Sequence, residues 1–224
     1  MYVLAVRHAE SEGNAGRTAD PDSPLTDAGR RQAERIAARL AGAGLVAVYS
    51  SPYCRAIQTA DPLAERLNLP IRLRGELCEA HLGPAPGPAG FSLPTPDELH
   101  RRHPRATADP DLAASVPWPP LHESLDDVIA RCRRMAAHLP ARWPGENDAV
   151  ALFGHGLPIA RLIEAWLTDA PGPSFRFVIV NAAISVLREA GGVRSLLALN
   201  DLQHLVGGPR FADVWTSSDR NQVW

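Results

Sequence analysis

The sequence predicts an α/β fold, a three-layer α/β/α sandwich with a mostly parallel central sheet and a lid-like insertion. Three short apolar runs, Tyr2–Val6, Leu45–Tyr49 and Ala149–Phe153, have the continuous hydrophobicity of strands that are covered on both faces. Segments with apolar residues at helical spacing separate these runs, and this alternation is typical of a parallel sheet. The chain of 224 residues is long enough for a single domain of this kind, residues 1–224.

The predicted elements of the first half follow in a regular order. Thr26 is the expected N-cap of a first helix, which leads to the second strand, Leu45–Tyr49. Ser51 is expected to cap the next helix, with Pro52 at the first helical position. A short strand at Ile71–Leu73 completes this half.

Residues 84–120 depart from this pattern because they contain many of the 21 prolines and show little periodicity. A short helix near Asp97–Arg102 is the exception. We interpret the stretch as an insertion over the edge of the sheet, either a lid or a wall of the substrate pocket. A low-complexity linker is the alternative.

Helix and strand patterns return after residue 120. Ser124 is the expected N-cap of a long helix with two aspartates in its first turn. The strand Ala149–Phe153 and a helix from about Pro158 to Leu167 follow. The remaining segments are predicted to close the sheet, and they are Phe175–Val180, Ile184–Glu189 and Val193–Leu199.

Composition excludes several classes of function. The net charge of −2 indicates no large basic surface for nucleic acid, and no stretch approaches the length of a membrane span. The chain starts directly with a strand, so a cytoplasmic location is the default expectation. Three cysteines without a CxxC spacing predict neither a disulfide framework nor a zinc site. All 23 basic residues are arginine, which excludes a Schiff-base lysine and a P-loop lysine.

Reactive side chains follow several of the predicted strands. Arg7 and His8 end the first strand, and His155 follows the strand at Ala149–Phe153. Arg55 lies in the first turn of the helix that follows the second strand, and Glu79 comes soon after the third strand. Because the carboxyl ends of parallel strands meet at one edge of a sheet, we expect a single pocket there.

Such a pocket suits phosphoryl transfer. Arginines can hold the oxygens of the transferred group, and helix N-termini near Ser51 and Gly156 would add backbone donors. A neutral histidine can attack phosphorus, and a carboxylic acid can protonate the leaving alkoxide.

The chain resembles the histidine phosphatase superfamily, the phosphoglycerate-mutase-like group, and within it the phosphatase branch. The hallmark Arg-His pair of that family stands as Arg7-His8, with Asn14 beyond it. Further matching segments follow in the order of the family and cover nearly the whole chain. They are Pro24–Ala33, Ser50–Ala60, Leu77–Gly83, Glu123–Leu125, Phe153–Gly156, Asn181–Leu187 and Leu199–Leu205.

The resemblance implies a metal-independent phosphomonoester hydrolase that acts through a phosphohistidine on a small phosphorylated metabolite. In that case His8 is the nucleophile and Glu79 the proton donor, and no metal or other cofactor is expected. Glu76 is a rival acid, but the spacing from Glu79 to Gly83 favours Glu79. The implied catalytic residues are His8, Glu79, Arg7, Arg55 and His155. The implied substrate-binding residues are Arg7, His8, Asn14, Arg55, Glu79, His155 and Gly156.

Three departures from the family pattern concern the pocket. Ala9 replaces the glycine of the usual Arg-His-Gly. The loop between Asn14 and Pro24 is shorter than usual, so that a common phosphate-binding glutamine has no clear counterpart, and Asp20 is a poor substitute. After Gly83 the chain is rich in proline where the family continues toward Trp-Glu-Gly. The sequence therefore does not identify the natural substrate. It also leaves open whether the protein forms a homodimer.

Two alternatives lie within the superfamily. A phosphoglycerate mutase usually has an arginine-rich stretch after the catalytic acid and a longer C-terminal region, which Ala80–Gly83 and the short tail do not match. A non-catalytic phosphate-binding member would be expected to lack one of the reactive residues, but His8, Arg55, Glu79 and His155 are all present.

Other phosphatase chemistries fit less well. A cysteine phosphatase needs an arginine six positions after its cysteine, and those positions hold Ala60, Pro84 and His138. An aspartyl phosphatase needs Asp-x-Asp directly after an apolar strand. Here Asp20-x-Asp22 and Asp109-x-Asp111 lie in polar, proline-flanked loops.

The region of the insertion contains further histidines and arginines. The histidines are a candidate metal site, although solvated loop histidines are the simpler interpretation. The arginines are candidates to bind an acidic second group of the substrate, although a solvated face explains them as well. These residues are His100, His103 and His122, and Arg101, Arg102 and Arg105.

Overall fold

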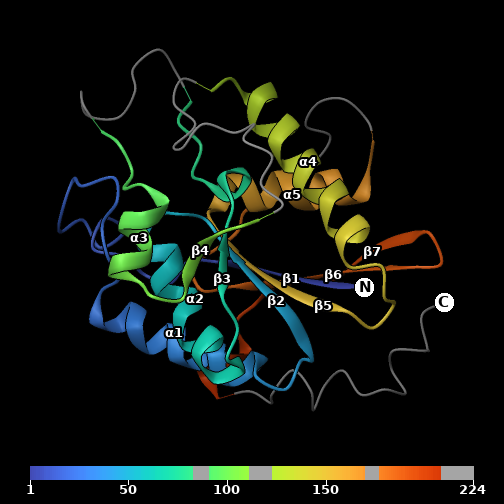
Figure 1. The fold of residues 1–224 in the computed structure, drawn as a ribbon, viewed down its shortest axis with the longest axis horizontal. Coiled ribbons are helices and arrows are strands. Elements are labelled where there is room, and N and C mark those ends of the chain that lie inside the picture. The colour runs from blue at the N-terminus through green and yellow to red at the C-terminus, as the bar shows by residue number, and fades with distance from the viewer. Residues whose placement is uncertain (83–90, 111–122, 170–176, 208–224) are drawn as a thin grey trace.

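A mixed seven-stranded sheet forms the centre of the molecule (Figure 1). The computed structural model describes residues 1–82, 91–110, 123–169 and 177–207. The strand order is β4-β3-β2-β5-β1-β6-β7. The first five strands in this order are parallel to one another, β6 is antiparallel to its neighbour β1, and β7 is antiparallel to β6. The strands are β1 (Tyr2–Arg7), β2 (Leu45–Ser50), β3 (Ile71–Leu73), β4 (Ala106–Ala108), β5 (Ala149–Gly154), β6 (Ile184–Ala190) and β7 (Val193–Asp201).

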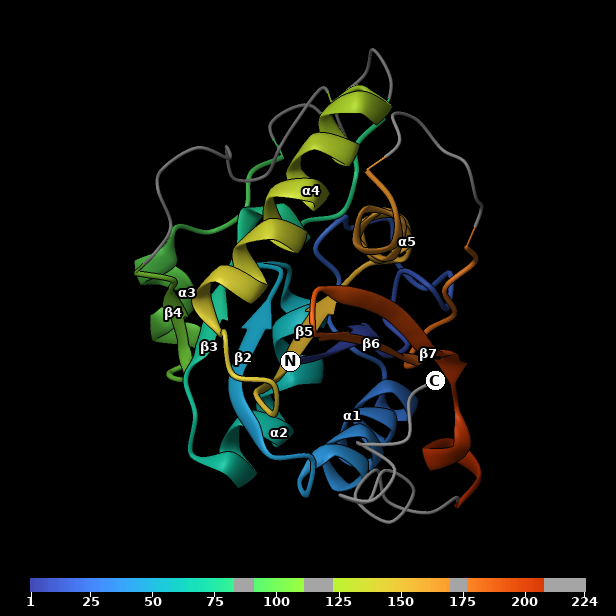
Figure 2. The same cartoon turned by 90° about the vertical axis from the view of Figure 1, so that its right-hand side faces the viewer.

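Helices cover both faces of the sheet, which confirms the predicted α/β class and its mostly parallel sheet. Helices α1 and α2 lie on one face, and α4 and α5 lie on the other (Figure 2). The helices are α1 (Asp27–Leu40), α2 (Cys54–Leu67), α3 (Pro96–Arg102), α4 (Leu125–Arg142) and α5 (Gly156–Leu167). Two 3₁₀ turns are η1 (Gly75–Leu77) and η2 (Gln203–Val206). None of the helices in these ranges is long and apolar enough to cross a membrane.

The hydrophobic core lies on both faces of the sheet because successive side chains of the central strands point to alternate faces. In β1, Leu4 and Val6 pack toward α1 and α2, while Val3 and Ala5 pack toward α4 and α5. Successive side chains of a strand point to opposite faces of the sheet. A stretch of strand that is buried on both faces must therefore be apolar at every position, as residues 2–6 of β1 are.

Two of the three expected helix caps are confirmed. Thr26 caps α1 by accepting a hydrogen bond from the backbone of Gly29, and Ser124 forms a capping box at the start of α4. The prediction for Ser51 and Pro52 is wrong, because α2 begins at Cys54. The hydroxyl of Ser51 lies against a histidine ring of the site described below and does not cap the helix.

The expected insertion contributes to the sheet itself. The predicted short helix is present as α3, and its start is fixed by a capping box between Thr95 and Glu98. The following strand, β4, was not predicted, and it pairs with β3 at the edge of the sheet. Residues 83–90 and 111–122 lie outside the described part, so the lid stays a prediction.

The predicted strand at Phe175–Val180 is wrong where the structure describes it, because residues 177–180 form no strand. Side-chain bonds attach this segment to β7 instead: the backbone N–H of Val180 donates to Asn200, and Asn200 donates to the carbonyl of Val178. The other two closing segments are confirmed as β6 and β7.

Candidate active site

The strand order brings the predicted pocket residues together at the carboxyl edge of the sheet. Strand β5 lies between β1 and β2, so the residues after these three strands are neighbours. The backbone N–H of His8 donates to Gly154, and that of Ser51 donates to Phe153. As a result, the ring centroids of His8 and His155 lie 5.1 Å apart although the residues are far apart in the chain.

His8 is buried and its ring is held in one orientation. Its Nδ1 lies 2.8 Å from the carbonyl oxygen of Ala9, so Nδ1 has the proton and donates to that oxygen. The other ring nitrogen, Nε2, accepts a hydrogen bond from Nε of Arg55 at 3.2 Å. Burial, and secondly the charge of Arg55, lower the pKa of His8 to about 3. The ring is thus neutral at pH 7, with a lone pair on Nε2.

Ala9 contributes through its backbone. Its carbonyl oxygen accepts from His8, and its N–H donates to the hydroxyl of Thr59 at 3.0 Å. Its side chain is fully buried. The replacement of the usual glycine therefore keeps the contacts that orient His8.

Arg55 connects the two histidines. It is the second residue of α2, and its Nη2 lies 3.2 Å from Nδ1 of His155. Its Nη1 donates to the carbonyl of Pro21 at 2.6 Å, and its guanidinium carbon lies 4.7 Å above the ring centre of Tyr53. These contacts fix the guanidinium plane beside both imidazole rings.

His155 stands directly before α5 and is completely buried. Its Nδ1 accepts from Arg55, so the ring proton is on Nε2, which lies 2.9 Å from the hydroxyl of Ser51. Burial is the main cause that lowers the pKa of His155 well below its usual value, and the charge of Arg55 adds to it. This second histidine is therefore also neutral at pH 7.

Glu79, not Glu76, faces the histidines. The Oε2 atom of Glu79 lies 3.5 Å from Nδ1 of His155 and 4.0 Å from Nη2 of Arg55, and its side chain is 30% exposed. Glu76 is only 3% exposed, and both of its carboxylate oxygens accept hydrogen bonds from Arg74. The structure therefore brings Glu79 into the pocket and commits Glu76 to an ion pair.

Arg7 and Gly156 lie against each other at the start of α5. A Cβ atom on Gly156 would lie 3.4 Å from Nη1 of Arg7, so the guanidinium lies directly beside the backbone at the start of this helix. The same Nη1 donates to the carbonyl of Ile179 at 2.6 Å. Among the described residues, the buried Nε of Arg7 has no hydrogen-bond partner.

Asn14 reaches the pocket through a residue that the sequence reasoning did not single out. The side chain of Asn181 donates to the carbonyl of His8 at 3.1 Å and to Oδ1 of Asn14 at 3.0 Å. In the sequence, Asn181 is only the first residue of a segment that resembles the family. Its position directly before the predicted strand 184–189 is the signal that points to a sheet edge.

The contacts of Ser51 and Asp22 were not predicted from the sequence. Ser51 was interpreted as a helix cap, although the partner of its hydroxyl is His155. The carboxylate of Asp22 accepts from the backbone N–H of Cys54, at the start of α2, at 2.7 Å. Burial raises the pKa of Asp22 to about 6. The sequence does not show which of Asp20 and Asp22 contacts α2. The packing of the loop before Pro24 onto α2 decides it in favour of Asp22.

Among the candidate arginines of the insertion, Arg102 lies near enough to Asp22 for its charge to act on the pKa of that carboxyl. Arg105 forms ion pairs with Asp61 and Glu65 of α2 and is therefore not directed at the histidines. His122 is not among the described residues. Within the described ranges, no three His, Cys, Asp or Glu side chains are grouped so that they could hold a metal ion.

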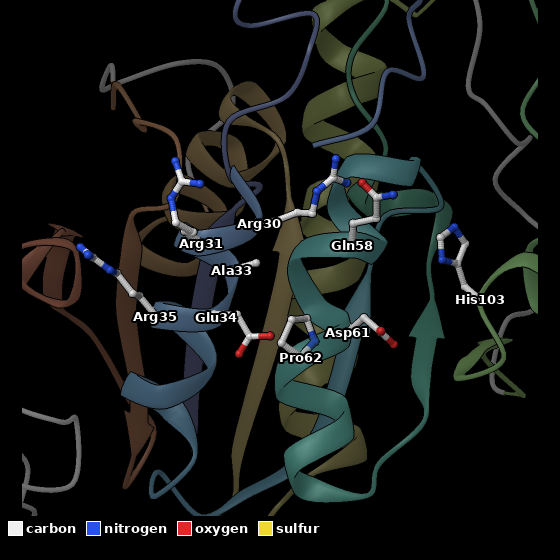
Figure 3. Close-up of a pocket in the computed structure, with 9 residues that line it drawn as sticks. All are labelled: Arg30, Arg31, Ala33, Glu34, Arg35, Gln58, Asp61, Pro62 and His103. Carbon is white, nitrogen blue, oxygen red and sulfur yellow. The ribbon is translucent and has the colours of Figure 1, made fainter. Parts of the chain in front are cut away.

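A separate cavity of about 550 Å³ lies between α1 and α2 (Figure 3). In this view Arg30 and Gln58 lie above Pro62, while Arg31 and Arg35 point outward from α1, away from α2. None of the predicted catalytic or substrate-binding residues lines it, but His103, a candidate metal ligand of the insertion, does.

Known proteins resemble this chain over most of its length. The family model of the histidine phosphatase superfamily (branch 1) matches residues 3–202. The chain is 30% identical, in an alignment 226 residues long, to probable phosphatase C1620.13 of Schizosaccharomyces pombe. The alignment covers 96% of this chain and 74% of that protein. It is 31% identical over 211 residues to phosphoglycerate mutase-like protein 4 of Arabidopsis thaliana, over 91% of this chain and 86% of that protein.

Solved structures share the fold. A mycobacterial glucosyl-3-phosphoglycerate phosphatase in complex with VO3 superposes with a TM-score of 0.63 at 25% identity, over 89% of this chain and 98% of that one. The ecdysone phosphate phosphatase of Bombix mori in complex with tungstate superposes with a TM-score of 0.69 at 19% identity, over 88% and 92%, and shows the fold alone.

The fold and the site define an α/β protein with two buried histidines and two arginines at the carboxyl edge of a mostly parallel sheet. The chain belongs to the histidine phosphatase superfamily, branch 1, as its resemblance to that family predicted. Its relatives include phosphatases and phosphoglycerate-mutase-like proteins.

Proposed function

We propose that the protein is a metal-independent phosphomonoesterase that hydrolyses a small phosphorylated metabolite through a phosphohistidine. The observation that supports this most directly is the state of His8. Its Nδ1 proton is held by the carbonyl of Ala9, and its pKa of about 3 leaves Nε2 unprotonated at neutral pH, with its electron pair facing Arg55. A neutral, oriented imidazole is what nucleophilic attack on phosphorus requires.

In the first step, Nε2 of His8 attacks phosphorus, and a P–N bond forms while the bond to the ester oxygen breaks. Glu79, protonated in the complex with substrate, gives its proton to the departing oxygen, so an alcohol leaves. The position of Glu79, 3.5 Å from Nδ1 of His155, is consistent with this role because it places the carboxyl beside the second histidine.

In the second step, water attacks the phosphohistidine. Glu79 is now ionised and takes a proton from the water, the P–N bond breaks, and inorganic phosphate leaves. The electron pair returns to Nε2 of His8, and Glu79 is again protonated, so the cycle closes. Both steps need the same carboxyl group in the same place.

The arginines stabilise the charge of the transferred group. Phosphoryl transfer depends mainly on positioning and on charge stabilisation at the equatorial oxygens. The guanidinium of Arg55 contacts a nitrogen of each histidine ring, and Arg7 lies beside the N-terminus of α5 at Gly156. We assign phosphate binding to these groups together with Asn14 and His155.

A phosphoglycerate-mutase-type transfer is the second candidate, since a relative named phosphoglycerate mutase-like protein 4 is 31% identical. A mutase must return the phosphoryl group to a substrate hydroxyl, whereas a phosphatase transfers it to water. The 30% exposure of Glu79 favours access of water to the acid.

Release of inorganic phosphate from a panel of phosphomonoesters in EDTA tests the proposal, with His8→Ala as the matched inactive protein. We expect release that survives EDTA and disappears in His8→Ala. Release that is lost in EDTA would contradict the metal-free mechanism. Transfer to an added phosphoglycerate without release would show a mutase instead.

A further inference from the structure

Glu79 lies in a short segment, residues 76–82, that we call the acid segment. The Oε1 atom of Glu79 accepts a hydrogen bond from within this segment, from the N–H of Ala80 at 3.0 Å. Its Oε2 atom lies 3.5 Å from His155 and 4.0 Å from Arg55, at the outer limit of an ion pair. The position of the carboxyl group therefore depends on where the backbone of the acid segment is held.

Arg131, in the middle of α4, holds the first end of the acid segment. Its Nη1 donates to the backbone carbonyl of Glu76 at 2.6 Å. Its Nε and Nη2 donate to the two carboxylate oxygens of Glu123 at 2.6 and 2.9 Å. Arg131 is 1% exposed, so these bonds are formed away from water, where charge-assisted bonds are strong.

Glu123 holds the other end. Its backbone forms an isolated parallel bridge with Leu82, three residues after Glu79. The Arg131–Glu123 pair thus contacts the acid segment at Glu76 and at Leu82, and Glu79 lies between these two contacts. Helix α4 also packs against the 3₁₀ turn η1 that precedes Glu79.

The side chain of Glu76 adds a third contact. It pairs with Arg74, which also bonds to Asp109 after β4, so that this carboxylate fixes η1 to the edge of the sheet. The carbonyl of the same residue is the acceptor for Arg131. Glu76, the rival acid of the sequence analysis, is therefore part of the support of Glu79.

We infer that the Arg131–Glu123 pair positions the general acid by fixing both ends of the acid segment. Arg131 does not touch the substrate, so it is a positioning residue. A lysine in its place would retain the charge but lose the planar group that donates to Glu123 and to the Glu76 carbonyl at once. The inference rests on the proposed function, because it concerns how Glu79 protonates the leaving group.

The test compares an alkyl phosphate, whose leaving group needs a proton, with p-nitrophenyl phosphate, whose leaving group needs little. The quantity measured is kcat/KM, which reports the first chemical step. For Arg131→Lys we expect a loss on the order of 10²-fold on the alkyl ester, the effect of displacing a catalytic group by about 1 Å, and a much smaller loss on the aryl ester.

The matched control is Arg39→Lys. Arg39 is also buried and paired with a carboxylate, Asp201, at 2.8 Å, but it joins α1 to β7. We expect it to change both esters equally. In a Glu79→Gln background, Arg131→Lys should no longer change the ratio of the two esters, because the group that it positions is already absent.

Two results would overturn the inference. One is an equal loss on both esters in Arg131→Lys, and the other is that Arg131→Lys still changes the ratio of the two esters by the same factor in the Glu79→Gln background. Should Arg131→Lys not fold, Glu123→Gln tests the same pair, since it retains one acceptor oxygen. Amide hydrogen exchange of residues 76–82 gives a readout that needs no turnover. We expect faster exchange in Arg131→Lys than in Arg39→Lys, and equal exchange would contradict the inference.

The exchange measurement also separates this inference from the proposed function. A wild-type protein that hydrolyses no ester would contradict the function, while faster exchange of residues 76–82 would still support the contacts of Arg131. Hydrolysis that disappears in His8→Ala, together with unchanged exchange and ester ratio in Arg131→Lys, would leave the function intact and reject the positioning role.

Discussion

The Nε atom of Arg55 lies 3.2 Å from Nε2 of His8, the ring nitrogen that is not bonded to the backbone. The same guanidinium donates to Nδ1 of His155 at 3.2 Å. One cation therefore contacts both rings, contributes to the lowered pKa of each, and stands where the charge of a phosphoryl group would develop.

The first prediction concerns Arg55. Arg55→Lys should reduce kcat by on the order of 10²–10³-fold, the usual cost of losing one preorganised donor to developing charge. The control is Arg66→Lys, an exposed arginine on the same helix that pairs with Glu34. Steady-state kinetics on the best ester of the panel measure both. An Arg55→Lys protein with the activity of Arg66→Lys would reject the role of Arg55.

The second prediction concerns the pH dependence of stability through His8. Its pKa is about 3 in the folded protein against 6.5 for the free side chain, so unfolding takes up a proton between these values. The free energy of unfolding should then fall as the pH falls from about 6.5 toward 3, by about 1.4 kcal/mol per pH unit for one such group. His155 adds a contribution of the same sign.

Urea unfolding of the wild type and His8→Asn at several pH values between 4 and 7 measures this effect. The variant retains His155, so its stability should still fall on acidification but with a smaller slope. Identical slopes in the two proteins would mean that His8 does not have the lowered pKa.

The third prediction separates the two glutamates. Glu79→Gln should reduce kcat/KM for alkyl phosphates by on the order of 10²–10⁴-fold, the range of general acid catalysis, and much less for p-nitrophenyl phosphate. Glu76→Gln removes a buried charge from its pair with Arg74, so we expect it to lower the melting temperature. Because Glu76 also supports the position of Glu79, a smaller selective loss on alkyl esters is compatible with this assignment, but a selective loss that is larger in Glu76→Gln than in Glu79→Gln would exchange the two roles.

The fourth prediction concerns Asp22. Its pKa is raised from 3.8 to about 6, mainly by burial, so the folded protein binds more protons than the unfolded protein between these values. Its contribution to the free energy of unfolding falls as the pH rises through this window. Asp22→Asn retains an oxygen that can accept from Cys54 but removes the charge. It should melt at a higher temperature than the wild type at pH 7.5.

The advantage of Asp22→Asn should disappear near pH 4, where both side chains are neutral in the folded protein. Thermal melts at the two pH values measure it. A variant that is less stable than the wild type at pH 7.5 would show that attraction between Asp22 and Arg55 outweighs the cost of burial.

Much of the fold was predictable because its signals are local. The apolar runs at β1, β2 and β5 and the caps at Thr26 and Ser124 depend on neighbouring residues, and the structure confirms them. Strand β4 was not predicted because three residues, Ala106–Ala108, give no periodicity and become a strand only by pairing with β3. Residues 177–180 failed as a strand because side-chain bonds to Asn200 take the place of backbone pairing.

The sequence by itself determined which reactive residues follow the strands. Since β1, β2 and β5 are parallel, their carboxyl ends had to meet, and His8, Arg55 and His155 followed from that pattern. Only the tertiary structure decided the partner of each polar group: Ser51 bonds to His155, Asn181 to His8, and Arg131 to the carbonyl of Glu76. These hydrogen bonds join residues 55 to 173 positions apart, and nothing in the local sequence specifies them. Their physical origin is burial, because a polar group enclosed away from water is stabilised by whichever hydrogen-bond partner the fold brings beside it.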